Sequence, residues 1–390
     1  MNIVYLVFNT VGKGTYWRAL ALAKALKRSG HNMTLVTTSQ ARRRRTSTYV
    51  DDGVVVVETP DLFTGSLRSG WDPWNSLRRI AWAHGQRADL VHAFELRPTV
   101  SAPALYLKFA RRTPFVSDWA DWFGKGGSVE ERPNPLVRAV LRPVETLFES
   151  GFRTQGLGVT AICTLLQEKA LALGFEEDAV LLLPNGSDTE RYYPLPRADA
   201  LRRTSLPPEY QYIGYLGSIF RQDAELMAQA FDCVHAQRPQ TRLVVVGACP
   251  VDISGLVQTP SAIIHTGYLD SGAVNAYLSS CDVLWLPLRN SNANRGRMPM
   301  KLNDYMSAGR PTVATAVGDM PALFAQERIG RVAADDAQLF AAGTLTLLDD
   351  ADLRARLGSH ARHVAETRFS WDALAASLSD FYAKMLARNR

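Results

Sequence analysis

Cysteines and long apolar runs are both scarce in this sequence of 390 residues. The four cysteines are scattered and fit no metal-site spacing, so we expect buried thiols in a reducing compartment. No apolar run approaches the roughly 20 residues needed to cross a bilayer. The apolar start, residues 1–8, lacks the basic residues and the cleavage site of a signal peptide. We therefore expect a cytoplasmic globular protein. The cysteines are Cys163, Cys233, Cys249 and Cys281.

Positive charge is unevenly distributed along the chain, whose net charge is +6 at pH 7. Residues 42–45 are all arginine, and an aromatic and basic segment follows them. A basic face that carries tryptophans can lie on an anionic membrane surface, so peripheral membrane contact is one interpretation. Ordinary packing of tryptophans beside solvated arginines is the other. No recognised nucleic-acid-binding motif accompanies the charge, so we expect no nucleic-acid partner. The aromatic and basic segment contains Trp71, Trp74, Arg78, Arg79 and Trp82.

Apolar runs of strand length alternate with helix-like stretches over nearly the whole chain. The runs are continuous, which is typical of parallel strands covered on both faces. In the first helical stretch, Ala19, Leu22, Ala23 and Leu26 line one face and Gly30 ends it. The pattern and the length predict an α/β protein with two doubly wound units. The predicted strands are residues 3–8, 33–38, 54–57, 90–93, 115–117, 158–163, 180–183, 212–216, 243–246, 262–265, 283–286, 312–314 and 331–333.

A turn-rich stretch near the middle, residues 184–196, has neither helical nor strand periodicity and is the predicted domain boundary. We expect an N-terminal domain of residues 1–190 and a C-terminal domain of residues 191–370. Ser370 can cap a final helix whose apolar residues recur at helical spacing. Such a stripe needs a hydrophobic surface, and we expect residues 371–390 to return to the first domain. The stripe consists of Trp371, Leu374, Leu378, Phe381 and Met385.

Residues 294–319 form the most informative segment of the sequence. A basic, glycine-containing loop there runs into a short helix and then a buried strand. Pro299 suits the first turn of that helix, where its missing N–H costs nothing. Arg297 and Lys301 therefore lie near the positive end of a helix, a favourable position for phosphate oxygens. Asp304 shares one helical face with Lys301 and can accept hydrogen bonds from sugar hydroxyls. This combination fits a nucleotide-sugar; a solvated, charged helix start is the alternative.

An ordered set of motifs resembles the GT-B glycosyltransferases of the large retaining group often called family 4. The resemblance covers nearly the full length, and it implies two Rossmann-like domains that face a cleft. The C-terminal helix would return to the N-terminal domain. The motifs are Thr10-Val-Gly-Lys-Gly-Thr-Tyr-Trp-Arg18, Leu183-Pro-Asn-Gly-Ser-Asp188, Ile213-Gly-Tyr-Leu-Gly-Ser218, Gly267-Tyr-Leu269, Cys281-Asp282, the segment 299–311 and Phe369-Ser-Trp371.

The resemblance implies that the second domain binds a nucleotide-diphosphate sugar and that the first holds the acceptor. Lys301 would pair with the diphosphate, and Asp304 would take the ribose hydroxyls where the family usually has glutamate. Gly217 and Ser218 would begin the loop that approaches the phosphates, with Arg221 as the nearest cation. Further donor contacts are implied for Gly12, Gly14, Tyr268, Leu269, Gly296 and Arg297.

Departure of a diphosphate needs fixed positive groups and backbone N–H donors at the leaving group. Lys301 and Arg297 are suitable, and such cations can do what a metal does elsewhere. The sequence offers no cluster of histidine and acidic ligands. We therefore expect neither a catalytic metal nor a cofactor.

Two positions depart from the family's pattern. The first of the family's paired glutamates would fall at Gly296, and the second at Asp304. The histidine that often touches the donor sugar belongs to a His-x-His pattern, which here reads His92-Ala93-Phe94. Donor-sugar hydroxyls would then be held differently, by Arg295 or Arg297, which leaves the sugar open.

Acceptor-binding groups are expected after the predicted strand 115–117, because doubly wound folds build their sites at the carboxyl edge of the sheet. Asp118 or Asp121 could orient or deprotonate an acceptor hydroxyl, and Asp121 is the candidate catalytic carboxylate. Capping of the following turn is the alternative for both. His92 either lines the acceptor site or is a satisfied core histidine.

Three functions compete at this point. The leading one is retaining transfer of a sugar to a hydroxyl of a glycan, a lipid-linked precursor or another surface-destined acceptor. A non-hydrolysing sugar-nucleotide epimerase shares the fold, but Lys301, Asp304 and the Phe369-Ser-Trp371 motif favour transfer. A nucleotide-sugar-binding subunit that has lost turnover is motivated by Gly296 and Phe94. The sequence leaves the base, the sugar, the linkage and the oligomeric state open.

Overall fold

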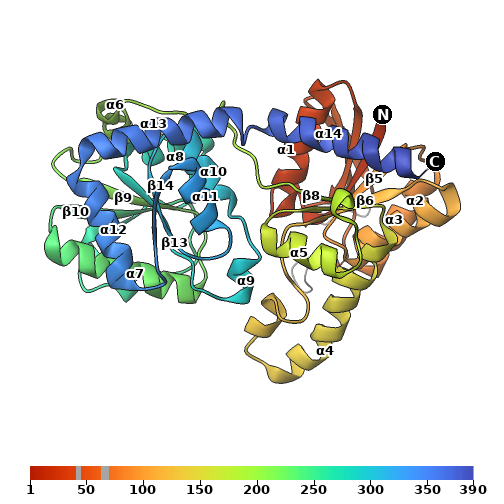
Figure 1. The fold of residues 1–390 in the computed structure, drawn as a ribbon, viewed down its shortest axis with the longest axis horizontal. Helices are drawn as coiled ribbons and strands as arrows, with labels where there is room; N and C mark the ends of the chain where they lie inside the picture. Colours follow the sequence, from red (N-terminus) through yellow and green to blue (C-terminus); the bar gives the residue numbers. More distant parts are fainter. Residues whose placement is uncertain (41–44, 63–69, 390) are drawn as a thin grey trace. The chain divides into compact units, whose positions relative to one another are not determined.

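The chain divides into two units, each with its own sheet and hydrophobic core (Figure 1). The computed structural model describes residues 1–40, 45–62 and 70–389. Unit 1 comprises Met1–Pro184, Gly296–Met298 and Trp371–Arg390. Unit 2 comprises Asn185–Arg295 and Pro299–Ser370.

Unit 1 is built on an eight-stranded sheet in the order β3-β4-β2-β1-β5-β6-β7-β8. Alternate residues of β1 point into two different cores. Tyr5 and Val7 pack with α1 and α14, whereas Leu6 and Phe8 pack with α2 and α3. Burial on both faces is the reason why the strand sequences are continuously apolar. The strands are β1 Asn2–Thr10, β2 Asn32–Thr38, β3 Ser47–Asp51, β4 Val54–Thr59, β5 Leu90–Phe94, β6 Phe115–Trp119, β7 Val159–Ala161 and β8 Val180–Leu182.

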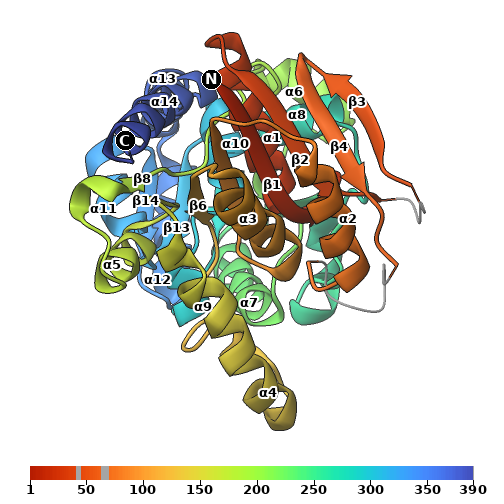
Figure 2. The same cartoon turned by 90° about the vertical axis from the view of Figure 1, so that its right-hand side faces the viewer.

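The helices of unit 1 cover both faces of this sheet, with one exception. Figures 1 and 2 show α4 extending away from the rest of unit 1. Two short helical segments, η1 (Ser128–Glu131) and η2 (Leu147–Gly151), flank α4 in the chain. The helices are α1 Thr15–Arg28, α2 Pro73–His84, α3 Pro98–Arg111, α4 Pro135–Thr146, α5 Thr164–Ala172 and α14 Trp371–Arg388.

Strand β3 differs from the predicted pattern, because it pairs antiparallel with β4 and was not predicted. Its central residues are exposed, so it lacks the continuous apolar run that identifies the other strands. Asp52 and Gly53 join the two strands with φ values of 45° and 80°. An Asp-Gly pair with positive φ at both positions is the favoured two-residue hairpin turn. That dipeptide was the available signal for the hairpin.

Unit 2 is built on a six-stranded sheet in the order β11-β10-β9-β12-β13-β14, in which every described pairing is parallel. Residues of β9 again alternate between two cores. Ile213 packs with α7 and α12, and Tyr212 packs with α6 and α8. The strands are β9 Gln211–Leu216, β10 Thr241–Val246, β11 Ile263–His265, β12 Val283–Leu286, β13 Thr312–Thr315 and β14 Gly330–Ala333. The helices are α6 Arg197–Thr204, α7 Arg221–Gln237, α8 Ser271–Ser280, α9 Asn292–Arg295, α10 Met300–Ser307, α11 Met320–Glu327, α12 Ala337–Asp349 and α13 Ala351–Thr367.

The C-terminal helix α14 is part of the core of unit 1. Leu374, Leu378, Phe381 and Met385 are buried against residues of β1 and α1. A polar side chain on the same face, Tyr382, is also completely buried. The predicted return of this helix to the N-terminal domain is confirmed.

The predicted fold class is confirmed as well, because every apolar run predicted as a strand forms one and both sheets are of the doubly wound α/β type. Within the described residues, the helices are all too short or too polar to span a bilayer.

Candidate active site

Three glycines lie at the carboxyl edge of the unit 2 sheet. Gly217, Gly247 and Gly267 directly follow or lie close behind β9, β10 and β11, with φ values of 78°, 85° and 68°. These positive values favour glycine. The directions in which side chains would project from Gly217 and Gly267 are open space. Three neighbouring strand ends therefore expose backbone that a ligand can approach closely.

An exposed aromatic ring lies beside this glycine edge. Tyr268 follows Gly267 and has 89% of its surface exposed, whereas Leu269 after it is partly buried against the unit 2 core. A large aromatic ring in that position offers a flat face for a planar ligand group.

Lys301 lies on the first turn of α10, next to the same edge. Its Nζ donates to the Tyr215 hydroxyl at 2.5 Å and to the Ser218 carbonyl at 3.2 Å. The Nζ also lies 3.9 Å from the centre of the Tyr215 ring. Burial lowers the pKa of this lysine to about 7, although Asp223 and Asp304 favour its charged form. No other lysine occurs between Lys169 and Lys384 in the sequence.

The start of α10 differs in one detail from the prediction. Pro299 has φ −62° and ψ 127° and precedes the helix as its N-cap, so the first helical residue is Met300. Asp304 follows one turn later. Burial raises the pKa of its carboxyl group to about 7, against the opposing effect of Arg191. Lys301 and Asp304 thus form a pair of titratable groups on one short helix.

A buried carboxylate, Asp223, organises the loop that precedes α10. It is 2% exposed and accepts hydrogen bonds from the Arg289 backbone N–H at 2.7 Å and from Asn294 Nδ2 at 3.0 Å. Arg295 in the same loop donates Nε to Asn290 Oδ1 at 2.7 Å. Arg221 is paired with Glu225 at 2.8 Å on the exposed surface of α7. The loop-organising role of Asp223 and Asn294 was not visible in the sequence.

The glycine loop of unit 1 is tightly closed on itself. Gly12 and Gly14 follow β1 with φ values of 78° and 54°. Trp17 donates its indole N–H to the Gly12 carbonyl at 2.9 Å. Gly14 has φ 54° and ψ −133°, a backbone conformation that favours glycine. The loop brings backbone to the carboxyl edge of β1.

Asp118 and His92, predicted to bind the acceptor, lie completely inside unit 1. Asp118 pairs with Arg18 at 3.0 Å and accepts a hydrogen bond from Thr160 at 2.6 Å. His92 contacts Thr160 and the hydroxyl of Tyr382, and burial lowers its pKa to about 3. Neither side chain has a surface that an acceptor could contact in this structure. The position of His92 corresponds to its alternative interpretation, a satisfied core histidine. Asp118 forms a buried ion pair with Arg18 rather than the turn cap that was the alternative for it.

Asp121, in contrast, lies on a partly exposed loop after β6. The loop backbone is held by two buried glutamates that were not predicted. Glu95 Oε1 accepts hydrogen bonds from the N–H groups of Ala120 at 2.6 Å and Asp121 at 2.9 Å. Glu149 accepts those of Phe123 and Gly124 at 2.7 and 2.8 Å.

Glu95 is itself unusual, because it has φ 57° although it is not glycine. Such backbone strain often accompanies functional sites. Burial raises the pKa of its carboxyl group well above the usual value, so the neutral acid is favoured.

Arg297 belongs to unit 1 through the segment Gly296–Met298. Its Nε lies 3.1 Å from Asp121 Oδ1, and their side chains are 19% and 35% exposed. Within unit 1, the structure therefore joins two of the predicted catalytic residues in one ion pair. Gly296 precedes this pair.

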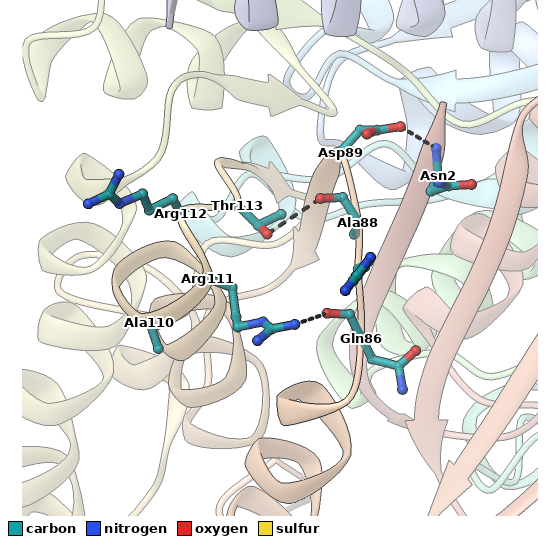
Figure 3. Close-up of a pocket in the computed structure, with 9 residues that line it drawn as sticks. Asn2, Gln86, Ala88, Asp89, Ala110, Arg111, Arg112 and Thr113 are labelled. Atoms are coloured by element: carbon teal, nitrogen blue, oxygen red, sulfur yellow. Dashed lines mark hydrogen bonds between the residues drawn. The ribbon is translucent and has the colours of Figure 1, made fainter.

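A pocket lined by arginines lies at the opposite end of the unit 1 sheet (Figure 3). Its lining includes Asn2, Asp89 and Thr113, which lie at or just before the amino ends of β1, β5 and β6. Doubly wound folds bind ligands at the carboxyl ends of their strands. This pocket is therefore separate from the candidate site.

In the described residues no group of histidine, cysteine and acidic side chains is placed to hold a metal ion.

Two curated relatives match part of the chain. A D-inositol 3-phosphate glycosyltransferase from Thermobispora bispora is 25% identical over 229 residues, which cover 54% of this chain and 52% of that protein. A GDP-mannose-dependent alpha-(1-6)-phosphatidylinositol monomannoside mannosyltransferase from Mycobacterium tuberculosis is 24% identical over 258 residues, covering 63% and 65%. The aligned part of the chain thus spans about half to two thirds of the length of these relatives.

Solved structures resemble the whole chain. Sucrose-phosphate synthase from Thermosynechococcus elongatus has a TM-score of 0.74 at 18% identity, with 99% of each chain covered. Anabaena HepE in complex with UDP has a TM-score of 0.70 at 16% identity, with 98% of this chain and all of that chain covered. At these identities the likeness shows the fold, which is that of GT-B glycosyltransferases.

Two family models match consecutive parts of the chain and together cover most of it. A glycosyl transferase 4-like domain matches residues 13–186, and a domain described as glycosyl transferases group 1 matches residues 210–350. The motifs, the two parallel sheets and these matches agree. The chain belongs to the group 1, family 4-like glycosyltransferases of GT-B fold.

Proposed function

We propose that this protein is a retaining glycosyltransferase that moves a sugar from a nucleotide-diphosphate sugar to a hydroxyl of a glycan or lipid-linked acceptor. The observation that carries the proposal is the position of Lys301. A lone lysine is held by Tyr215 and Ser218 beside exposed backbone at three strand ends. A cation beside glycine backbone that a ligand can approach closely suits a diphosphate.

The diphosphate, the ribose and the base of the donor each have a matching group in unit 2. The diphosphate lies against Lys301 and the backbone of Gly217 and Ser218, and Asp304 accepts the ribose hydroxyls. The base lies beside Tyr268 and Leu269. Arg221 is exposed and can exchange its partner Glu225 for a phosphate at little cost, because exposed ion pairs are weak.

Unit 1 supplies the acceptor side. Asp121 is the proposed acceptor-binding carboxylate. The loop that contains Gly12 and Gly14, predicted as donor contacts, brings backbone to the same sheet edge. Asp118 and His92 are not included, because they are buried. Arg297 is paired with Asp121 at 3.1 Å and orients its carboxylate.

The reaction proposed is a substitution on one face of the sugar. The bond from the anomeric carbon to the diphosphate breaks, and the acceptor oxygen forms a bond to the same carbon. The acceptor proton passes to the leaving phosphate or to Asp121. Lys301 stabilises the negative charge that develops on the diphosphate, a role that the sequence predicts for Arg297 as well.

Thermal unfolding with a panel of nucleoside diphosphates tests the donor site, because a ligand of the folded state raises the melting temperature. We expect one base to stabilise the protein most. Incubation with the corresponding nucleotide-sugars should then give transfer, or slow donor hydrolysis without acceptor, with the anomeric configuration retained.

A nucleotide-sugar-binding subunit without turnover remains the second candidate, because Gly296 stands where the family has a glutamate. Binding without turnover in the presence of acceptors would favour that candidate. Exchange at the sugar C2 would instead favour an epimerase.

A further inference from the structure

Helix α4 and the residue that follows it, Leu147 of η2, share an exposed face that is entirely apolar. Leu136, Val140, Pro143 and Leu147 recur at spacings of four, three and four residues, which places them on one side of a helix. Leu136, Val140 and Leu147 are 76%, 67% and 54% exposed. We call these four residues the α4 stripe. Stripes of this kind normally face a hydrophobic partner.

The opposite side of α4 faces the protein. Glu145 is 3% exposed and lies 3.5 Å from Arg132 and 4.0 Å from Arg97. The helix packs chiefly on η1 and η2, the segments on either side of it. Both views show it extending outward from unit 1 (Figures 1 and 2). The polar side of the helix is thus used for attachment, and the apolar side is presented outward.

The charges of α4 are arranged as in helices that lie on a membrane surface. Its two basic residues are the half-buried Arg138 and the exposed Arg142, and its single acidic residue, Glu145, is buried. Arg142 is paired with Glu130 of η1 and keeps 45% of its side chain exposed. Helices of this type bury an apolar face among lipid chains while basic residues contact anionic headgroups.

We propose that α4 is the element with which this protein docks on the surface of an anionic membrane. A second copy of the chain is a poorer occupant. A stable dimer buries about 800 Å² on each partner, which four side chains on a single projecting helix do not provide. The proposal extends the proposed function, since α4 belongs to the acceptor-binding unit, but membrane binding itself needs no donor site.

The aromatic and basic segment predicted to contact a membrane fits this role less well. Arg79 is completely buried and donates to the Val7 and Thr99 carbonyls at 2.8 and 3.1 Å. Trp71 packs on Phe148 with a ring distance of 5.2 Å. Trp71 follows the alternative interpretation of ordinary packing, whereas Arg79 is a buried hydrogen-bond donor and not one of the expected solvated arginines. Arg42, Arg43 and Arg44 lie outside the described residues.

Sedimentation of the full chain with sucrose-loaded vesicles tests the proposal. We expect binding to vesicles of phosphatidylcholine with phosphatidylglycerol, and weaker binding to phosphatidylcholine alone or at high salt. The triple variant Leu136→Gln, Val140→Gln, Leu147→Gln should lose about tenfold or more in partitioning. Val50→Gln is the matched control, since Val50 is also 67% exposed but lies on β3.

A fluorescent reporter variant tests the proposal independently of whether the triple variant folds correctly. The emission of Val140→Trp should shift to the blue on addition of anionic vesicles, and that of Val50→Trp should not. Unchanged vesicle binding in the triple variant, or no binding by the native chain, would overturn the proposal. A native dimer that the triple variant converts to a monomer would overturn it too. Nucleoside diphosphates should raise the melting temperature equally in all variants. This measurement tests the proposed donor site independently of membrane binding.

Discussion

At the scale of single residues, Lys301 combines a lowered pKa with a position at the glycine edge of unit 2. Its neighbours are the hydroxyl of Tyr215 and the carbonyl of Ser218, neither of which is a carboxylate. The positive charge of Lys301 therefore has no negatively charged group in direct hydrogen-bond contact among these two neighbours. A diphosphate would supply the missing negative charge.

Lys301→Ala should weaken nucleoside diphosphate binding about 10- to 100-fold, the equivalent of one charged hydrogen bond of about 1.5–3 kcal/mol. Titration calorimetry measures the change. Arg202→Ala is a suitable control, because Arg202 forms an exposed pair with Asp199 on α6. Equal affinities of Lys301→Ala and the native protein would exclude Lys301 from the donor site.

The pKa of Lys301, lowered to about 7, also predicts a pH dependence. The lysine is charged below that pH and neutral above it, and a bound diphosphate stabilises the charged form. Affinity for a nucleoside diphosphate should thus decrease as pH rises above about 7, with proton uptake on binding. Calorimetry in two buffers of different ionisation enthalpy detects that uptake. Lys301→Arg should bind with little pH dependence, since arginine stays charged.

Glu95 shows how a residue can act on the site through its neighbour. It holds the backbone of Ala120 and Asp121 with one oxygen and has a raised pKa, so a neutral amide can take its place. Glu95→Gln should keep most of the activity, whereas Glu95→Ala should lower kcat about tenfold with a smaller change in donor KM. Steady-state kinetics separates the two. Equal losses in both variants would contradict this positioning role.

At the scale of elements, α14 is held in unit 1 by a polar network as well as by its apolar stripe. The Tyr382 hydroxyl lies 2.6 Å from His92 Nδ1 and 2.9 Å from the Tyr5 hydroxyl. The network continues through Thr160 to Asp118 and Arg18. Buried networks of this kind are costly to leave partly satisfied.

Tyr382→Phe should therefore destabilise unit 1 by about 1–3 kcal/mol, because His92 and Tyr5 lose a buried partner. Urea unfolding gives the change in free energy. Tyr193→Phe, at a tyrosine that is 42% exposed, should change stability by less than about 0.5 kcal/mol. A Tyr382→Phe protein as stable as the native one would show that α14 is held by its apolar contacts alone.

The strands could be predicted from the sequence because each one is buried on both faces, which leaves a continuous apolar run. β3 was not predicted because its central residues face solvent and it has no continuous apolar run, although Asp52-Gly53 indicated the turn. In the site, Lys301 and Asp304 could be paired from their helical spacing. A core position was one of the two interpretations of His92, but the sequence could not decide between them. The burial of Asp118 could not be predicted, because its partner Arg18 is far away in sequence and meets it only in the folded chain.

At the scale of the whole molecule, the two units have separate hydrophobic cores, and the proposed donor groups Lys301, Asp304 and Tyr268 all lie in unit 2. Scanning calorimetry should resolve or broaden into two transitions, since multidomain chains depart from two-state unfolding. A nucleoside diphosphate should raise the unit 2 transition by several degrees and leave that of unit 1 nearly unchanged. An equal rise in both transitions would contradict a donor site confined to unit 2.

The return of α14 to unit 1 also determines the order in which the two units can complete folding during translation. The ribosome makes the strands of unit 1 first, but Leu378, Phe381 and Tyr382, which complete that core, come after all of unit 2. Unit 2 can fold while unit 1 is still incomplete, because the apolar surface of β1 and α1 is exposed to solvent until α14 covers it. The part of the chain translated earliest is thus the last to mature, and in the interval it is the part that chaperones would protect.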